Sequence, residues 1–187
     1  MTKQRWVFEP GHTSAQFSVR HMMITNVRGH FKDIEGFIEI DPDNPTDVTV
    51  EATMKTADLW SGDTFRDEHL RAGDFFDVEN HPEITFKGDQ VSYLGQNDLT
   101  LGGDLTIRGI TKPVTLDVQD LGRWDTPFWE DGQDKGPITR AGFSATTRVN
   151  RHDFGVSWNG TLDKGGVVVS DTVVITLDVE ALNTPAQ

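Results

Sequence analysis

The fold is decided by the stretch VRGHFKDIEGFIEI, residues 27–40. Apolar residues and glycines occupy every second position in two successive phases: Val27, Gly29 and Phe31, then Ile34, Gly36, Ile38 and Ile40. An alternation with a period of two predicts a half-buried β-strand. The change of phase near Lys32 and Asp33 predicts a β-bulge, and a bulge bends the strand that contains it. Long, bent strands of this kind favour a closed β-barrel.

The same alternation continues on both sides of this stretch. Residues 12–21 place Phe17, Val19 and His21 on one side, and turn residues at 41–45 predict a hairpin with the alternating run 48–55. Further alternating runs lie at residues 84–86, 91–93, 99–107, 114–118, 141–149 and 173–179. We therefore predict one domain, residues 1–187, with about eight antiparallel strands closed into a barrel without exposed edges. A two-sheet sandwich is the alternative architecture, because alternation does not distinguish one closed sheet from two stacked sheets.

Two segments break the alternation. Between residues 58 and 80, Thr64 and Asp67 predict the capped start of a short helix, and Gly73 predicts its left-handed end. Large apolar residues surround this helix, which is therefore expected to plug or cover the barrel: Leu59, Trp60, Phe65, Leu70, Phe75 and Phe76. Residues 124–137 are acidic and have no period, which predicts a long, mobile loop. The sequence leaves open a homodimer through this loop or through a strand edge.

The composition excludes several classes of partner. The chain has 17 Lys and Arg against 30 Asp and Glu, and its formal net charge of -13 would repel nucleic acid. No stable membrane insertion is expected, because there is no polybasic cluster and no apolar run near the ~18 residues of a membrane-spanning helix. The sequence begins without an apolar stretch of signal-peptide length, which predicts a cytoplasmic protein.

Metal binding and catalysis are not expected from the remaining motifs. His12 and His21 have opposite parity along one strand, and His69 lacks a second histidine one turn along its helix. The chain has no cysteine, no Gly-x-Ser-x-Gly elbow, no phosphate loop and no dinucleotide fingerprint. We therefore expect no metal site, no cofactor and no enzymatic activity. A polar cluster inside the barrel would instead favour an enzyme that acts on a lipid.

Several short motifs follow one another along nearly the whole chain. They are His12-Thr13-Ser14, His21-Met22, Val27-x-Gly29-x-Phe31, Arg66-Asp67-x-His69-Leu70, Asp74-Phe75-Phe76-Asp77, His81-Pro82-x-Ile84-x-Phe86, Gly102-Gly103-x-Leu105-Thr106-Ile107 and Asn150-Arg151-x-Asp153-Phe154-Gly155. In this order they resemble the YceI-like family of polyisoprenoid-binding proteins. The resemblance implies an all-β fold, an extended eight-stranded antiparallel lipocalin-like barrel with a short lid helix near its mouth. It also implies a long apolar interior that holds an isoprenoid quinone or a polyprenyl chain. Many members of the family are periplasmic.

The predicted ligand-binding residues are large side chains expected to point inward from the strands and the lid, with one histidine and one arginine for a polar head group. They are Phe17, Val19, His21, Phe31, Met54, Trp60, Phe65, Arg66, Leu70, Phe75, Phe76, Phe86, Leu105, Phe143 and Phe154. Each methylene that a lipid buries contributes roughly 0.8 kcal/mol, so a long chain would bind without a single hydrogen bond. The alternative is that these residues merely fill the barrel, in which case a stress-associated protein-interaction module is the better interpretation.

Overall fold

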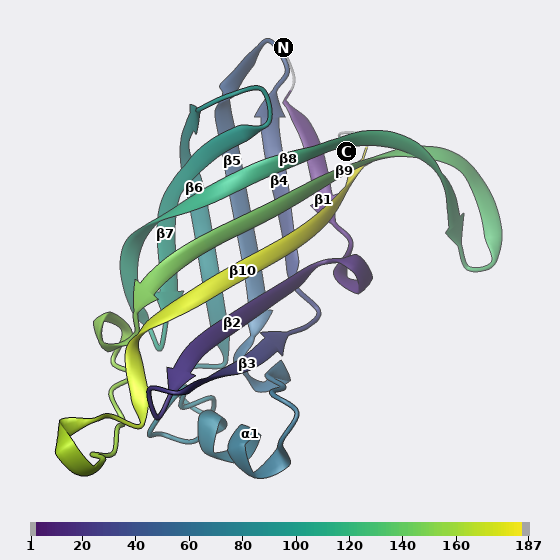
Figure 1. The fold of residues 1–187 in the computed structure, drawn as a ribbon. Helices are drawn as coiled ribbons and strands as arrows, with labels where there is room; N and C mark the ends of the chain where they lie inside the picture. The colour runs from purple at the N-terminus through teal and green to yellow at the C-terminus, as the bar shows by residue number, and fades with distance from the viewer. Residues whose placement is uncertain (1–2, 185–187) are drawn as a thin grey trace.

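The computed structural model describes residues 3–184, which form one antiparallel sheet that closes on itself (Figure 1). The strands are β1 (Gln4–Phe8), β2 (Ser14–His21), β3 (Thr25–Phe31), β4 (Glu35–Asp41), β5 (Asn44–Lys55), β6 (Glu83–Tyr93), β7 (Asp98–Ile107), β8 (Ile110–Glu130), β9 (Gln133–Asn150) and β10 (Val169–Thr184). The helical segments are η1 (Pro10–His12), η2 (Thr56–Asp58), α1 (Thr64–Arg71), η3 (Arg151–Phe154) and η4 (Asp163–Gly165). None of the helices in residues 3–184 has the length and hydropathy needed to cross a membrane.

Closure is achieved by the short strand β1. It pairs with β4 on one side and with β10 on the other, where Arg5 lies opposite Thr184 and Phe8 lies opposite Ala181. Within residues 3–184, the closed ring therefore contains eight strands, β1 and β4 to β10, and the predicted eight-stranded barrel is confirmed. Strand β2 pairs with the other half of β10, and β3 adds to the free edge of β2. The sandwich is excluded, because the sheet has no break between two layers.

The bulge predicted within residues 27–40 is wrong, because this stretch contains two strands. Strand β3 pairs with β2, whereas β4 pairs with β1 and β5. Residues 32–34 leave the sheet between them, and Asp33 adopts a left-handed conformation with φ of 52°. The apolar phase shifts there because the chain turns to a new neighbour, and Ile34, which is 3% exposed, anchors the turn in the core.

The mobile loop predicted at residues 124–137 is also wrong. The ends of β8 and β9 form a β-hairpin here, which projects beyond the barrel (Figure 1). Its tip is the dipeptide Asp131-Gly132, whose φ angles of 51° and 73° are the positive pair that a two-residue primed turn requires. Trp124 and Trp129 are exposed on this hairpin. The dipeptide Asp131-Gly132 is a hairpin signal that was present in the sequence within this acidic segment.

The segment around α1 covers one end of the barrel (Figure 1). Leu59 and Phe75 are buried there against barrel residues such as Ile84. The helix is capped by Asp63, whose carboxylate accepts a hydrogen bond from the Arg66 amide at 2.9 Å. The caps predicted at Thr64 and Asp67, for the start of the helix, and at Gly73, for its end, are therefore wrong. Asp67, which is 4% exposed, instead accepts hydrogen bonds from the amide and the hydroxyl of Ser61, and the helix ends at Ala72 in extended backbone.

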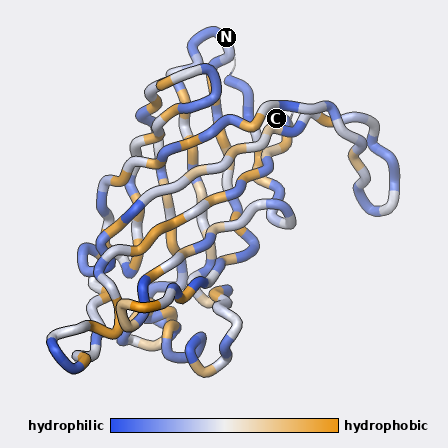
Figure 2. Tube along the Cα trace, viewed as in Figure 1, coloured by the Kyte–Doolittle hydropathy of each residue, from blue (hydrophilic) through white to orange (hydrophobic). Residues whose placement is uncertain are grey.

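Apolar residues are interspersed with hydrophilic ones along the barrel strands, as Figure 2 shows. In a closed barrel, successive side chains point alternately inward and outward. The apolar positions that share the inner face form three contiguous clusters, represented by Phe31, Trp6 and Leu101. The outward positions are mostly polar. The sequence alternation is thus converted into an apolar interior, which positions the candidate site.

Candidate functional site

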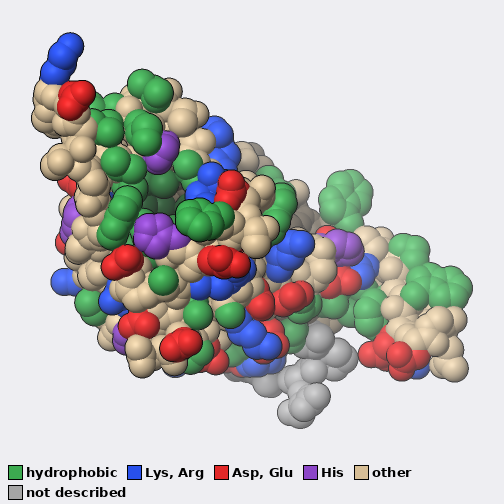
Figure 3. Space-filling model, turned by 90° about the horizontal axis from the view of Figure 1, so that it is seen from below, with side chains coloured by type: hydrophobic (Ala, Val, Ile, Leu, Met, Phe, Trp, Pro, Cys, Tyr) green, Lys and Arg blue, Asp and Glu red, His purple; other side chains and the backbone are tan. Residues whose placement is uncertain are grey.

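An apolar cavity of about 280 Å³ runs through the interior of the barrel. At one end its wall includes Phe75 and Phe76 from the segment that follows α1. At the other end the wall includes Tyr93, the last residue of β6, and Arg123 from β8. Figure 3 looks at the α1 end and shows a hollow with hydrophobic side chains around it and inside it. The cavity is called the tunnel below.

The length of the tunnel follows from the strand geometry. On β6, wall residues extend from Ile84 to Tyr93, and these nine residue steps measure about 30 Å at ~3.3 Å per residue. Barrel strands tilt by roughly 35–45°, so the tunnel is about 21–25 Å long along the barrel axis. A volume of about 280 Å³ distributed over this length describes a narrow tunnel. Such a shape suits a thread-like ligand better than a compact ring system.

Eleven of the predicted ligand-binding residues lie on the tunnel wall. They are Phe17, Val19, Phe31, Met54, Leu70, Phe75, Phe76, Phe86, Leu105, Phe143 and Phe154. Those on strands face inward because the alternation places them on the inner face, and three follow or belong to the lid helix. Their contact with a ligand stays a prediction.

The other four predicted residues, His21, Trp60, Phe65 and Arg66, do not line the tunnel. Phe65 is 83% exposed on α1, and Trp60 is 52% exposed, with its ring stacked on His30 at 4.9 Å between centroids. Arg66 donates two hydrogen bonds of 2.7 Å to Ser61, which leaves the guanidinium outside the tunnel wall. His21 is the last residue of β2, beyond the last wall residue of that strand, Val19. These residues lie near the α1 end but outside the tunnel.

Among the described residues, three charged side chains contribute to the wall: Asp120, Arg123 and Arg151. Arg151 is 4% exposed and donates hydrogen bonds to the backbone carbonyls of Val156, Trp158, Val169 and Ser170, at 2.7 to 3.2 Å. Burial lowers the pKa of Arg151, and the attraction of Asp171 partly offsets this effect. With four carbonyls bound, this guanidinium ties η3 to the start of β10 and has a structural role.

Arg123 and Asp120 are not among the residues predicted from the sequence, because strict alternation would place one of them on the outer face. A register shift in the β8–β9 ladder between Asp120 and Gly122 brings both side chains to the inner face. Gly122 has a φ of 97°, a conformation that favours glycine. The available signal was this glycine, which interrupts an alternating run.

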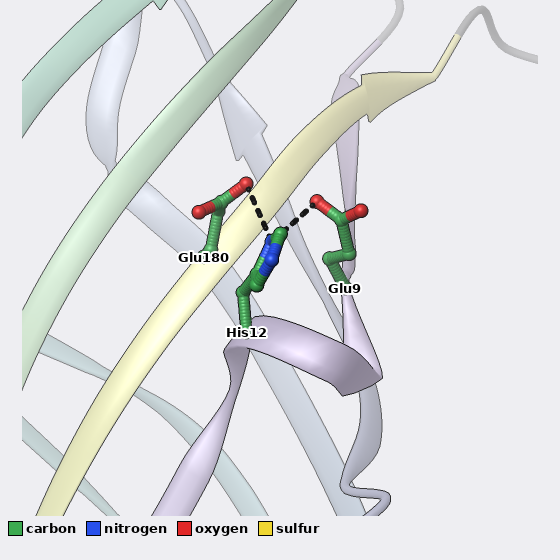
Figure 4. A group of neighbouring side chains, drawn as sticks. All are labelled: Glu9, His12 and Glu180. Atoms are coloured by element: carbon green, nitrogen blue, oxygen red, sulfur yellow. Dashed lines mark hydrogen bonds and ion pairs between the residues drawn. The ribbon is translucent and has the colours of Figure 1, made fainter. Parts of the chain in front are cut away.

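A second polar cluster lies outside the tunnel, where β1, η1 and β10 meet (Figure 4). The Nδ1 atom of His12 lies 3.3 Å from Glu9 Oε2 and 3.4 Å from Glu180 Oε1. A histidine and two carboxylates are possible metal ligands. However, the Nε atom of Arg140 lies 3.2 Å and 2.7 Å from the same two carboxylate oxygens. A guanidinium therefore already supplies the positive charge, and the geometry is that of an ion-pair network.

This network shifts two pKa values. The hydrogen bond to Glu9 and the negative charge of Glu180 raise the pKa of His12. Burial opposes ionisation of Glu9, but its hydrogen bonds to Glu180 and Arg140 and the charge of Arg140 outweigh burial and lower its pKa. Arg140 also donates a hydrogen bond to the carbonyl of Pro127 at 3.1 Å. The network thus connects η1 and β10 to the base of the projecting hairpin.

Similar proteins are found by sequence and by structure. A UPF0312 protein of Pseudomonas putida strain W619 is 33% identical over 174 residues, which cover 93% of this chain and 83% of that protein. BcnA of Burkholderia cenocepacia has the same fold, with a TM-score of 0.75 and 21% identity over 92% of this chain and 98% of BcnA. A polyisoprenoid binding domain from Saccharophagus degradans also shares the fold, with a TM-score of 0.64 and 11% identity over 96% of this chain and 98% of the domain.

The family assignment follows from the order of the motifs, the closed barrel and these similarities. The model of the YceI-like domain matches residues 6–181, which include every strand of the closed ring in whole or in part. This protein therefore belongs to the YceI-like family.

Proposed function

We propose that this protein binds and carries or stores a long-chain isoprenoid-type lipid, an isoprenoid quinone or a polyprenyl chain, inside its barrel. The observation that carries the proposal is the narrow apolar tunnel between the α1 end and Tyr93. Burial of an apolar chain in such a tunnel is favourable by roughly 0.8 kcal/mol for each methylene removed from water. A chain of several prenyl units would therefore bind tightly without a chemical step.

The length of the tunnel suits a long, extended chain. At about 21–25 Å, the tunnel would hold a chain of several prenyl units along the barrel axis. Such a chain would contact the apolar wall along its whole length, and these contacts are collectively large. The shared fold with a domain described as polyisoprenoid binding supports the same ligand class.

The alternative functions receive less support from the wall. An enzyme that acts on the lipid needs a nucleophile or an acid and base beside the ligand. Among the described residues, no histidine lines the tunnel, and Arg151 is committed to four backbone carbonyls. The one carboxylate that these described residues place on the wall, that of Asp120, accepts hydrogen bonds from the Gly122 amide and from Arg123. We therefore propose carriage without conversion. A protein-interaction module would not need the tunnel.

The proposal is tested by the lipids that the protein holds and by chain-length dependence. Organic extraction of the purified protein followed by mass spectrometry is expected to release a long-chain isoprenoid. The delipidated protein should bind a fluorescent prenyl probe, and unlabelled prenols should displace it more strongly as the chain lengthens, until the tunnel is full. Repeated absence of such a lipid, together with no binding of the probe, would refute the proposal.

A further inference from the structure

We propose that Arg123 and Asp120 form a subsite for the polar head group of the ligand at the end of the tunnel opposite α1. The head group that fits this subsite is uncharged and has oxygen atoms that form hydrogen bonds. Examples are the carbonyl groups of a quinone and the hydroxyl groups of a quinol. This inference rests on the proposed function, because it assigns an orientation to a chain that lies in the same tunnel.

The bulge in β8 builds this subsite. Before the bulge, the inner face of β8 is apolar at Leu116 and Val118, and Asp120 follows in the same phase. Without a bulge, position 122 would point inward and Arg123 would point outward. The register shift at Asp120/Gly122 reverses this order, and Arg123 joins the wall. Bulges are over-represented beside functional sites because they re-aim a side chain in this way.

Asp120 holds both the bulge and the arginine. Its Oδ1 atom accepts a hydrogen bond from the Gly122 amide at 2.9 Å, and its Oδ2 atom lies 3.4 Å from the Arg123 guanidinium. Gly122 supplies the φ of 97° that the turn needs. The guanidinium also lies over the indole of Trp6, 5.7 Å from the ring centroid. Trp6 is 5% exposed and belongs to the wall, so Arg123 is positioned between the apolar interior and solvent.

Arg123 has donors available, in contrast to Arg151. A guanidinium carries five N–H donors. In the part of the chain that the structure describes, Asp120 accepts one long hydrogen bond from Arg123, and the arginine side chain is 47% exposed. Arg151, at the α1 end, donates to four carbonyls. The tunnel thus has one arginine able to bind a ligand oxygen, and it lies far from α1.

The local charge favours a neutral head group. The carboxylate of Asp120 balances the guanidinium of Arg123, and the whole chain carries a formal charge of -13. A negatively charged phosphate would be repelled by the carboxylate of Asp120 and by the net negative charge of the chain. A quinone carbonyl accepts from Arg123, and a quinol hydroxyl also donates to Asp120. The apolar tail then extends toward Phe75 and Phe76 at the α1 end.

The test compares three probes of equal prenyl length: a prenyl benzoquinone, a hydrocarbon without a head group, and a prenyl phosphate. Arg123→Met retains the length of the side chain and removes its donors. Loss of a hydrogen bond to a charged donor should weaken quinone binding by about 10-fold to 100-fold and leave hydrocarbon binding unchanged. The matched control is Arg148→Met on the outer face of β9, where Arg148 is exposed and does not line the tunnel. This control should bind all three probes normally.

A second variant tests the charge argument and does not remove the arginine. Asp120→Asn retains an oxygen that accepts the Gly122 amide, and it should raise the affinity for the prenyl phosphate relative to the quinone by about 10-fold. Quinone affinity that is unchanged by Arg123→Met, with intact hydrocarbon binding, would overturn the subsite and leave the proposed function standing. Tighter binding of the phosphate than of the quinone by the unmodified protein would overturn the neutral head group. Failure of all three probes to bind would overturn the proposed function itself.

Discussion

A charge placed on the tunnel wall at Phe76 should weaken lipid binding strongly, whereas the same charge at Phe65 should leave it nearly unchanged. Sequence alone assigned both phenylalanines to one lid, but the structure separates them. Phe76 lines the tunnel and packs edge-on against Phe31 at 5.7 Å between centroids. Phe65 belongs to α1, is 83% exposed and does not line the tunnel. Phe76→Asp and Phe65→Asp are therefore a matched pair within one segment.

The magnitude follows from desolvation of the new carboxylate. In the ligand-free variant, water in the tunnel solvates Asp at position 76, and an apolar chain would expel this water. Burial raises carboxyl pKa values by as much as 3–5 units, and a half-buried site at about two units costs about 2.7 kcal/mol. Binding of a prenyl chain to Phe76→Asp should therefore weaken by about 100-fold. Phe65→Asp should change the affinity less than about two-fold, because an exposed charge loses no solvent.

Titration of delipidated variants with a fluorescent prenyl probe measures these effects. Circular dichroism and urea unfolding should show that both variants retain the barrel. Phe76→Leu, which shortens the side chain without adding a charge, should bind within about ten-fold of the unmodified protein. Equal affinities for Phe76→Asp and Phe65→Asp, with both proteins folded, would refute the assignment of Phe76 to the binding wall.

Three further predictions concern stability. Arg151→Met removes the guanidinium that binds four backbone carbonyls, of which that of Val169 keeps a side-chain donor, Asn159. Its free energy of unfolding in urea should fall by about 3–5 kcal/mol, and a loss below about 1 kcal/mol would contradict the structural role. The hydrogen bond to Glu9 raises the pKa of His12, so His12 stabilises the fold fully below its unfolded pKa of about 6.5 and loses this effect as pH rises through the folded pKa. The stability difference between the protein and His12→Gln should therefore shrink from pH 6 to pH 9, and a constant difference would disprove the coupling. A Cβ atom at Gly103 would lie inside contact distance of a backbone carbonyl oxygen, so Gly103→Ala should lower the thermal midpoint, whereas Gly11→Ala, which meets no neighbour within 4 Å, should not.

The alternation of apolar residues predicted much of the wall because a strand has only two faces. Once Phe17 faces inward on β2, Val19 must do so as well. The same reasoning failed on α1. The rotation of a short helix depends on its cap and its contacts, and with Asp63 as the cap Phe65 lies on the solvent side. Periodicity over eight residues carries too little information to distinguish these orientations.

Changes of phase were ambiguous in the sequence for a different reason. Near Asp33 a slip in the alternation suggested a bulge, but the chain there changes partner and begins a new strand. At Gly122 a real bulge was present and was overlooked. A one-residue slip looks the same in both cases, because only the neighbouring strand determines whether pairing resumes with the same partner. This ambiguity is why Arg123 was missed.

The sequence by itself determined the all-β class, the apolar inner face and the family, since these depend on local periodicity and on the order of motifs along the chain. Tertiary structure alone decided how the ring closes, through the pairing of β1 with β10. It also decided which arginine is committed to backbone carbonyls, Arg151, and which has free donors on the tunnel wall, Arg123. The physical reason is that closure and hydrogen-bond saturation depend on partners that are distant in sequence, and no local pattern specifies them.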